Sequence, residues 1–256
     1  ENQVLKNMEV HHHPKAGKKN FKEYFLEFLM IFLAVTMGFI AENLREHFVE
    51  RKREKEYMIS LVRDLHSDIT KINARLNSNI EDIAMADSIF MLFEKGDYNN
   101  TSGSMYYLAR RLSLRNFFRP NDGTTQQLNY AGGLRLMQNE RVVDSIQAYI
   151  NQTIVIETLI QLEDLEIAEY RKSMNWVFDG IVVNKMNGTW ANPNLQRLNY
   201  NPPLISYDKK DINNVAMQLA IVKGNRVKQK SIMDKLLTSA ESLVRLIQKE
   251  YHLKDE

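Results

Sequence analysis

A long apolar run near the beginning of the chain constrains its fold most. From Tyr24 to Ala41 the sequence holds one charged residue, Glu27, in eighteen positions. At a helical rise of ~1.5 Å per residue the run reaches roughly 27 Å, close to the hydrocarbon thickness of about 30 Å. The sequence therefore predicts a transmembrane helix over 23–42, preceded by a basic tail over 1–22. The mean hydropathy of −0.41 hides this span within a largely polar chain.

Two other interpretations of the apolar run are a buried core helix and a cleaved signal peptide. The run is the most apolar part of the chain, and polar clusters flank it on both sides. No Ala-x-Ala site follows it, and more than twenty residues precede it, whereas a signal peptide has its cleavage site directly after a short apolar region. We therefore expect an uncleaved signal anchor.

Basic residues flank both ends of the span, so their number alone does not decide its orientation. Those before it are Lys15, Lys18, Lys19 and Lys22, and those after it are Arg45, Arg51, Lys52, Arg53 and Lys55. A short basic tail tends to stay inside the cell, whereas a large domain is translocated largely regardless of its charge. We expect a cytoplasmic N-terminus and a large C-terminal domain in the periplasm or outside.

Small residues within the span offer a face for helix association. Ala34, Gly38 and Ala41 recur at spacings of four and three, which places them on one side of a helix. Glu27 lies about one turn inside the span, where its carboxylate can reach the interface or pair with a partner's lysine. We assign these four residues to membrane-helix association.

The absence of Gly and Pro between Gly38 and Gly96 predicts that the span continues outward as a helical stalk over 43–95. Its first part, to about Glu56, is rich in Glu, Lys and Arg and reads as a solvated helix. An apolar seam then repeats at spacings of three and four. Its members are Val62, Leu65, Ile69, Ile72 and Leu76, and Asn79 occupies a later seam position.

Helical periodicity dominates the remainder of the chain, 96–256. Helices are predicted over about 104–116, 142–181 and 211–252, and an Asn-, Pro- and aromatic-rich stretch predicts an ordered loop over 184–208. A short strand over 180–183 is the one alternative to helix. We predict an all-α protein: one span, a helical stalk and an antiparallel bundle of three to five helices.

The segment 125–149 resembles a family of uncharacterised bacterial inner-membrane proteins that have one N-terminal span and an all-helical exported domain. The resemblance rests on Leu128, Gly132, Leu134, Arg135, Leu136, Asn139 and Asp144. It implies a bacterial inner-membrane location and the same topology, and no activity. The span here is richer in Phe and Met than is usual in that family.

The same segment also has a direct physical interpretation. Two adjacent glycines, Gly132 and Gly133, indicate either close helix packing or a helix break. Arg135 and Asn139 are four residues apart, which would place them on one helix face. Packing is one explanation for this pair, and a candidate interaction face is the other.

Few patterns in the sequence point to chemistry. The chain has no Cys, which excludes thiol catalysis, and a net charge of +2, which supplies no field for nucleic-acid binding. His11, His12 and His13 read as a polar tail, and the carboxylates Glu163, Asp164 and Glu166 as a solvated helix face. We expect no cofactor, no metal site and no enzymatic activity.

Two hypotheses of function follow. The first is a membrane-anchored structural or interaction subunit that binds the lipid bilayer and forms a homo-oligomer or joins other membrane-protein chains through its span and stalk. The second is a membrane-anchored sensor or small-ligand-binding helical module. Trp176, Trp190 and Tyr207 are the residues that could line its ligand site.

Overall fold

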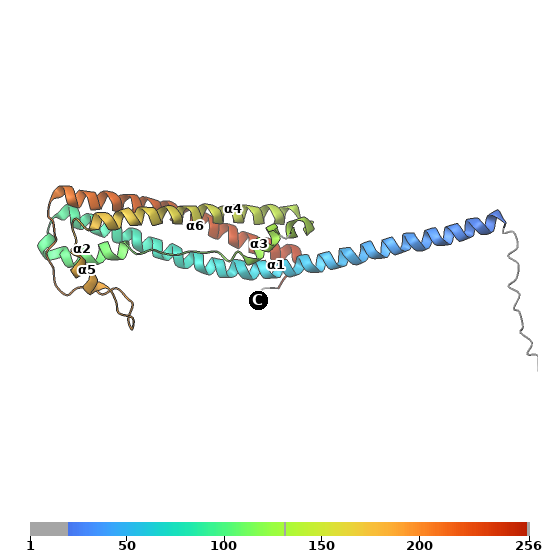
Figure 1. Ribbon diagram of the computed structural model, residues 1–256, viewed down its shortest axis with the longest axis horizontal. Coiled ribbons are helices and arrows are strands. Elements are labelled where there is room, and N and C mark those ends of the chain that lie inside the picture. The colour runs from blue at the N-terminus through green and yellow to red at the C-terminus, as the bar shows by residue number, and fades with distance from the viewer. Residues whose placement is uncertain (1–19, 131, 255–256) are drawn as a thin grey trace, which may run out of the picture. The chain divides into compact units, whose positions relative to one another are not determined.

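A computed structural model describes residues 20–130 and 132–254 of the chain, in which all regular structure is helical (Figure 1). The predicted all-α class is confirmed. The elements in chain order are α1 (Phe21–Lys95), α2 (Tyr98–Leu112), α3 (Gly123–Tyr130), the short 3-10 helix η1 (Gly133–Leu136), α4 (Glu140–Met174), α5 (Gly180–Met186) and α6 (Lys209–Tyr251). The tail 1–19, with His11, His12 and His13, lies outside the described residues.

The chain divides into two compact units, with the boundary between Arg53 and Glu54. In the first unit, the described residues form the first part of α1, and its large apolar side chains except that of Leu29 are exposed. None of the most apolar stretch is buried, which differs from the core helix of a soluble protein. This helix is long and apolar enough to cross a membrane.

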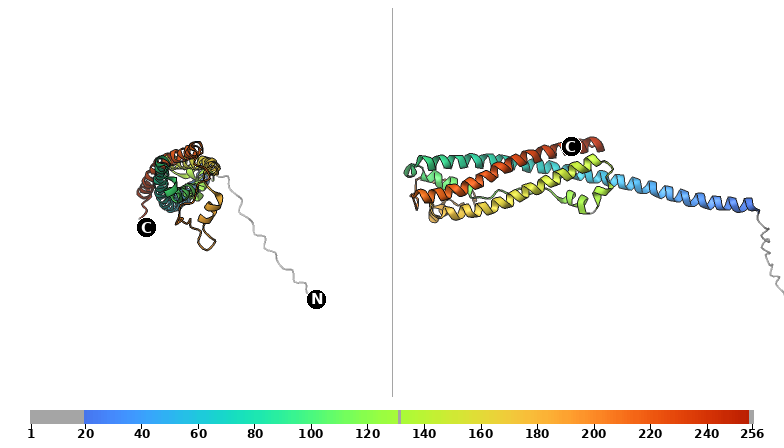
Figure 2. Two further views of the ribbon diagram at one scale, coloured as in Figure 1. Left: turned by 90° about the vertical axis from the view of Figure 1, so that its left-hand side faces the viewer. Right: turned by 90° about the horizontal axis from the view of Figure 1, so that it is seen from above.

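The second unit is a helical bundle that begins at Glu54. α4 and α6 lie side by side and run in opposite directions, and the part of α1 from Glu54 onward packs beside them (Figure 1, Figure 2). α2 and the extended segment after it complete the bundle beside the three long helices. The segment 43–95 is predicted to be a stalk apart from the bundle, whereas in the structure α1 belongs to the bundle from Glu54 onward.

The core of the bundle consists of two apolar clusters stacked along its length. The first joins α1 up to Leu76, α4 up to Leu159 and α6 from Met233. The second joins α1 from Ala86 to α2, α5 and the other halves of α4 and α6. On all three long helices the gap between the clusters holds polar residues, so the core is interrupted at one level.

Several predicted helix boundaries need correction. The helix expected over 104–116 runs from Tyr98 to Leu112, because Asp97 and not the Gly103 region precedes its first turn. The helix expected over 142–181 ends at Met174, and a turn leads to α5, whose first turn is capped by Asp179 accepting from the Ile181 N–H. The apolar spacing continues past Met174 because the turn itself buries Val177. The alternative of a strand over 180–183 is wrong.

The loop after α5 spans 187–208 and is held to the bundle by hydrogen bonds. The Tyr106 hydroxyl donates to the Pro203 carbonyl at 3.0 Å and accepts from the Asp179 N–H at 2.8 Å. The Gly103 N–H donates to the Asn201 side chain at 3.1 Å. The non-helical segment begins at 187, three residues after the predicted beginning at 184.

Candidate functional site

The gap between the two apolar clusters holds a buried layer of charged and amide side chains. α1 presents its members from one face, since they lie four and three residues apart, and α4 and α6 present theirs at the same level. All have a relative exposure of 7% or less. We call this set the polar layer; it consists of Arg75, Asn79, Asp82, Glu163, Asn225, Arg226 and Gln229.

Glu163 accepts three hydrogen bonds at the centre of the polar layer. Arg75 donates from Nη2 at 3.0 Å and Arg226 donates from Nε at 2.7 Å. Gln229 donates from Nε2 at 2.7 Å, and its own Oε1 accepts from Arg75 at 2.8 Å. One carboxylate therefore links all three long helices through charge-assisted hydrogen bonds, which are stronger than neutral ones.

Asp82 forms the second acidic centre of the polar layer. Its Oδ2 lies 3.3 Å from Nη1 of Arg226, and its Oδ1 lies 3.4 Å from Nη1 of Arg111 on α2. Asn116 donates to Oδ2 at 2.5 Å. Arg226 also donates to the Leu112 carbonyl at 3.2 Å, at the carboxyl end of α2, where a cation is favoured by the helix dipole. The layer thus connects α2 to the three long helices.

Burial works against the charges in this layer. It lowers the pKa of the Arg75 guanidinium, with Glu163 opposing the shift, and it raises the pKa of Asp82, with the neighbouring arginines opposing. Arginine nevertheless stays protonated in proteins. The geometry therefore holds two buried cations, with Arg111 at the edge, against two carboxylates.

The polar layer contains more hydrogen-bonding atoms than partners among the described residues. Neither amide atom of Asn79 is hydrogen-bonded, although this side chain is fully buried. The same holds for Nε and Nη1 of Arg75. Unpaired buried polar atoms cost free energy, so this level of the bundle is less well satisfied than the apolar clusters around it.

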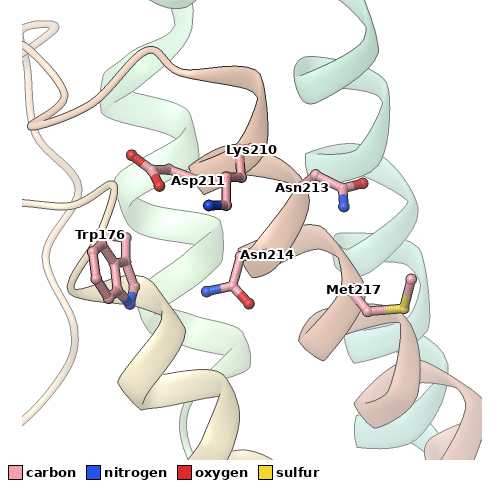
Figure 3. Close-up of a pocket in the computed structure, with 6 residues that line it drawn as sticks. All are labelled: Trp176, Lys210, Asp211, Asn213, Asn214 and Met217. Atoms are coloured by element: carbon pink, nitrogen blue, oxygen red, sulfur yellow. The ribbon is translucent and has the colours of Figure 1, made fainter.

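Two surface grooves add possible binding surfaces. A groove of about 490 Å³ lies beside Trp176, which follows α4, and the first two turns of α6 (Figure 3). Its α6 residues are Lys210, Asp211, Asn213, Asn214 and Met217. A second groove, of about 750 Å³, lies between α1 and the end of α6, and its lining residues are Lys55, Ile59, Val62, Arg63, His66, Gln248, His252, Leu253 and Lys254.

The three aromatic residues proposed for a ligand site do not meet. Trp176 lines the first groove, whereas Trp190 is 98% exposed on the loop. Tyr207 packs against Tyr98, and its hydroxyl accepts from the Leu204 N–H at 3.2 Å. One of the three residues therefore lies at a groove.

The residues assigned to membrane-helix association all lie on the first unit. Ala34, Gly38 and Ala41 are exposed, and a Cβ at Gly38 would meet no atom within 4 Å. Glu27 is partly exposed. The described structure thus leaves this small-residue face open.

The stalk seam has a different environment from the one expected. Leu65, Ile72 and Leu76 are buried in the first apolar cluster, and Val62 and Ile69 pack against it. Their partners are α4 and α6 of the same chain. The spacing does not specify this partner, because a seam of this kind fits any complementary apolar face. The seam is therefore used within the bundle.

Arg135 and Asn139 do not share a helix face. Arg135 lies on η1, and Asn139 is the N-cap of α4, where its side chain accepts from the Val142 N–H at 3.3 Å and donates to Glu250 at 2.8 Å. Gly132 between α3 and η1 has a φ of 73°, a left-handed conformation that glycine adopts readily. Both interpretations of the two glycines hold, since the helix breaks at Gly132 and a Cβ at Gly133 would lie 2.9 Å from Leu128 on α3. The shared helix face of Arg135 and Asn139 is wrong.

The polar layer is the feature that the sequence analysis missed. The sequence predicts a solvated face for Glu163, yet this side chain is 2% exposed and paired with two arginines. The sequence signal for this layer is a polar residue at a position where the helical periodicity predicts an apolar one. Glu163 occupies such a position on α4, and Asn79 occupies one on α1. Within residues 20–130 and 132–254 no group of three or more His, Asp or Glu side chains has the arrangement of a metal site.

Comparison of the chain with family models, curated proteins and solved structures finds no match.

Proposed function

We propose that this chain is a membrane-anchored structural or interaction subunit, which holds a helical bundle at a bacterial inner membrane and assembles with copies of itself or with other membrane proteins. One observation carries the proposal. Before Arg53 almost every large apolar side chain of α1 is exposed, whereas from Met58 onward α1 buries one apolar face in the bundle, with Met58, Leu61, Leu65 and Ile72 at most 1% exposed. A soluble role would leave the first group in water, so a bilayer or partner helices are needed to cover it.

The small-residue face of the span is the proposed assembly surface, because the seam is already used within the bundle. Replacing Gly38 by leucine fills that face at its centre, where close helix approach depends on small side chains. Ile40→Leu, on the opposite side of the helix, is the matched control. In lipid nanodiscs and mild detergent we expect the parent chain and Ile40→Leu to be cross-linked into oligomers or complexes, and Gly38→Leu to lose them. A parent chain that is monomeric and partner-free after gentle cross-linking would contradict the proposal.

The proposed orientation places the bundle in the periplasm and the N-terminus in the cytoplasm. Because the chain has no Cys, a single thiol can be introduced at a chosen position. Ser231 on α6 is exposed and therefore suits this purpose. A membrane-impermeant thiol reagent should label Ser231→Cys in cells with a permeabilised outer membrane, and label Ala16→Cys only after lysis. The reverse pattern would overturn the orientation.

A second candidate function is a ligand-binding module, and the groove beside Trp176 favours it. The chain has two tryptophans, so Trp190→Phe leaves Trp176 as the single fluorescent reporter at the groove. Ligand binding to the folded state also raises the unfolding temperature. A small-metabolite screen should find a compound that changes both Trp176 emission and the unfolding temperature. A screen that changes neither would count against this second function.

A further inference from the structure

The groove between α1 and the end of α6 has an unusual combination of charge and apolar surface. On α1, its lining residues are at positions 55, 59, 62, 63 and 66, so they occupy one helix face. Lys55, Arg63 and Lys254 contribute cationic side chains, and His66 and His252 contribute imidazoles. No carboxylate is among the lining residues that belong to the described part of the chain. An anion is therefore the ligand that its charge would favour.

Three of the described carboxylates close in sequence to the groove accept hydrogen bonds from groups outside its lining. Glu54 accepts from the Tyr251 hydroxyl at 2.5 Å, and Asp64 accepts from the Thr124 hydroxyl at 2.5 Å. Glu250 accepts from Asn139 at 2.8 Å. Among the ion pairs found within residues 20–130 and 132–254, none uses the side chains of Lys55, Arg63 or Lys254. The three cations are therefore available to a ligand.

The end of α6 is shaped by a specific turn that builds one wall of the groove. His252 has a φ of 49°, a left-handed conformation that non-glycine residues seldom adopt. The Leu253 N–H donates to the Gln248 carbonyl at 3.0 Å, which closes the helix end. Leu253 then packs against the first apolar cluster, as Val62 does, and both residues line the groove. The turn thus anchors Leu253 and places His252 and Lys254 beside the groove.

The apolar part of the groove's lining favours a ligand that also has an apolar part. Val62 and Leu253 are partly buried, and Ile59 is 42% exposed. A volume of about 750 Å³ lies within the size range of small-molecule sites, which combine apolar walls with a few polar groups. A simple inorganic anion would use the cations and leave this apolar surface uncovered. A ligand with both an anionic head and an apolar tail would use the whole groove.

We propose that this groove binds an alkyl phosphate, with the phosphate held by Lys55, Arg63 and Lys254 and the tail against Ile59, Val62 and Leu253. The same chemistry is available from a phospholipid headgroup region and from a soluble phosphate ester. This site goes beyond the proposed function and does not depend on whether the chain assembles. Its failure in a binding experiment would therefore leave the assembly experiment unaffected.

The test uses the full chain in phosphatidylcholine nanodiscs and isothermal titration calorimetry. The probes are hexyl phosphate, inorganic phosphate and hexanol, which separate the head from the tail. We expect hexyl phosphate to bind most tightly and to weaken as salt is added, because exposed charges are screened. Equal affinity for inorganic phosphate, or for hexanol, would overturn the proposal, as would no binding of hexyl phosphate.

Charge reversal identifies the site. The double variant Arg63→Glu, Lys254→Glu changes two exposed lining residues. The control Lys228→Glu, Lys235→Glu makes the same change in net charge on α6, at exposed residues that do not line the groove. The first variant should bind hexyl phosphate roughly tenfold more weakly or worse, since two charge-assisted contacts are lost. The second should bind as the parent does. Circular dichroism confirms that both variants are folded, and unchanged affinity in the first would overturn the proposal.

A final comparison identifies the source of the phosphate. Phosphatidylglycerol in the nanodisc supplies anionic headgroups at the bilayer surface. If these headgroups compete for the groove, hexyl phosphate should bind the parent chain more weakly in phosphatidylglycerol nanodiscs than in phosphatidylcholine nanodiscs. This difference should disappear in the Arg63→Glu, Lys254→Glu variant. Such a result would support the bilayer as the source. Unchanged binding would support a soluble phosphate ester.

Discussion

Replacing Glu163 by glutamine is expected to destabilise the bundle strongly while leaving its shape intact. The carboxylate is 2% exposed and accepts from Arg75, Arg226 and Gln229 at 2.7–3.0 Å. Glutamine has nearly the same volume, so the packing is preserved and the negative charge is lost. Asp82 then remains as the carboxylate of the polar layer, facing two buried guanidinium groups.

The expected size of this effect follows from the burial of the ion pairs. Removing one partner of a buried ion pair costs about 3–5 kcal/mol, because the other charge stays buried without compensation. For a domain of about this size, each kcal/mol lowers the unfolding temperature by roughly 2–4 °C. Glu163→Gln should therefore lower it by roughly 6–20 °C.

Thermal unfolding of the full chain in nanodiscs, followed by circular dichroism, measures this change. Glu169→Gln is the matched control, because it makes the same substitution on α4 in an exposed pair with Lys172. Exposed pairs contribute little, so the control should differ from the parent by about 0.5 kcal/mol or less. Adding Arg75→Gln to Glu163→Gln should restore part of the loss, since one uncompensated charge is removed. Equal, small effects of Glu163→Gln and Glu169→Gln would refute this reasoning.

Three further predictions follow from local geometry. Gly103→Ala should destabilise the bundle by about 1–3 kcal/mol, because the new Cβ would lie 2.5 Å from the Tyr200 carbonyl oxygen. Gly224→Ala should stabilise α6 by about 0.5–1 kcal/mol, because its Cβ would meet no atom within 4 Å. Chemical denaturation measures both changes. Tyr106→Phe removes the hydroxyl that bridges Pro203 and Asp179, so limited proteolysis should cut the loop 187–208 faster than in the parent, and an unchanged rate would contradict this role. Burial raises the pKa of Asp68, so the folded state keeps a proton that the unfolded chain releases; the stability of the parent relative to Asp68→Asn should therefore be greatest at about pH 4 and fall towards about pH 7. Unfolding temperatures at both pH values measure this difference, and a rise with pH would show that hydrogen bonds to the carboxylate outweigh its burial.

The seam on α1 shows where sequence reasoning stops. Its spacing correctly predicts a helix with one apolar face from Met58 onward, because burial requires that periodicity. The spacing does not identify the partner of that face, since apolar contact is non-directional. The structure shows that α4 and α6 of the same chain cover it. The seam therefore gives no support to association between chains.

The polar layer shows a second limit. Glu163 stands in the apolar register of α4, but an acidic residue on a long charged helix is most often solvated. Its burial depends on Arg75 and Arg226, which are distant in sequence and come together when three helices align. A polar residue that occupies a seam position is the available signal, and its charged partners cannot be read from one helix.

The candidate span, the all-α class and the approximate positions of the long helices can be predicted from the sequence, because they depend on local composition and periodicity. The tertiary structure decided which faces are paired, where α4 ends and which charges are buried. These outcomes depend on contacts between residues far apart in the chain, as Arg75, Glu163 and Gln229 illustrate. Local patterns measure how much surface a helix must bury, and long-range packing selects what buries it.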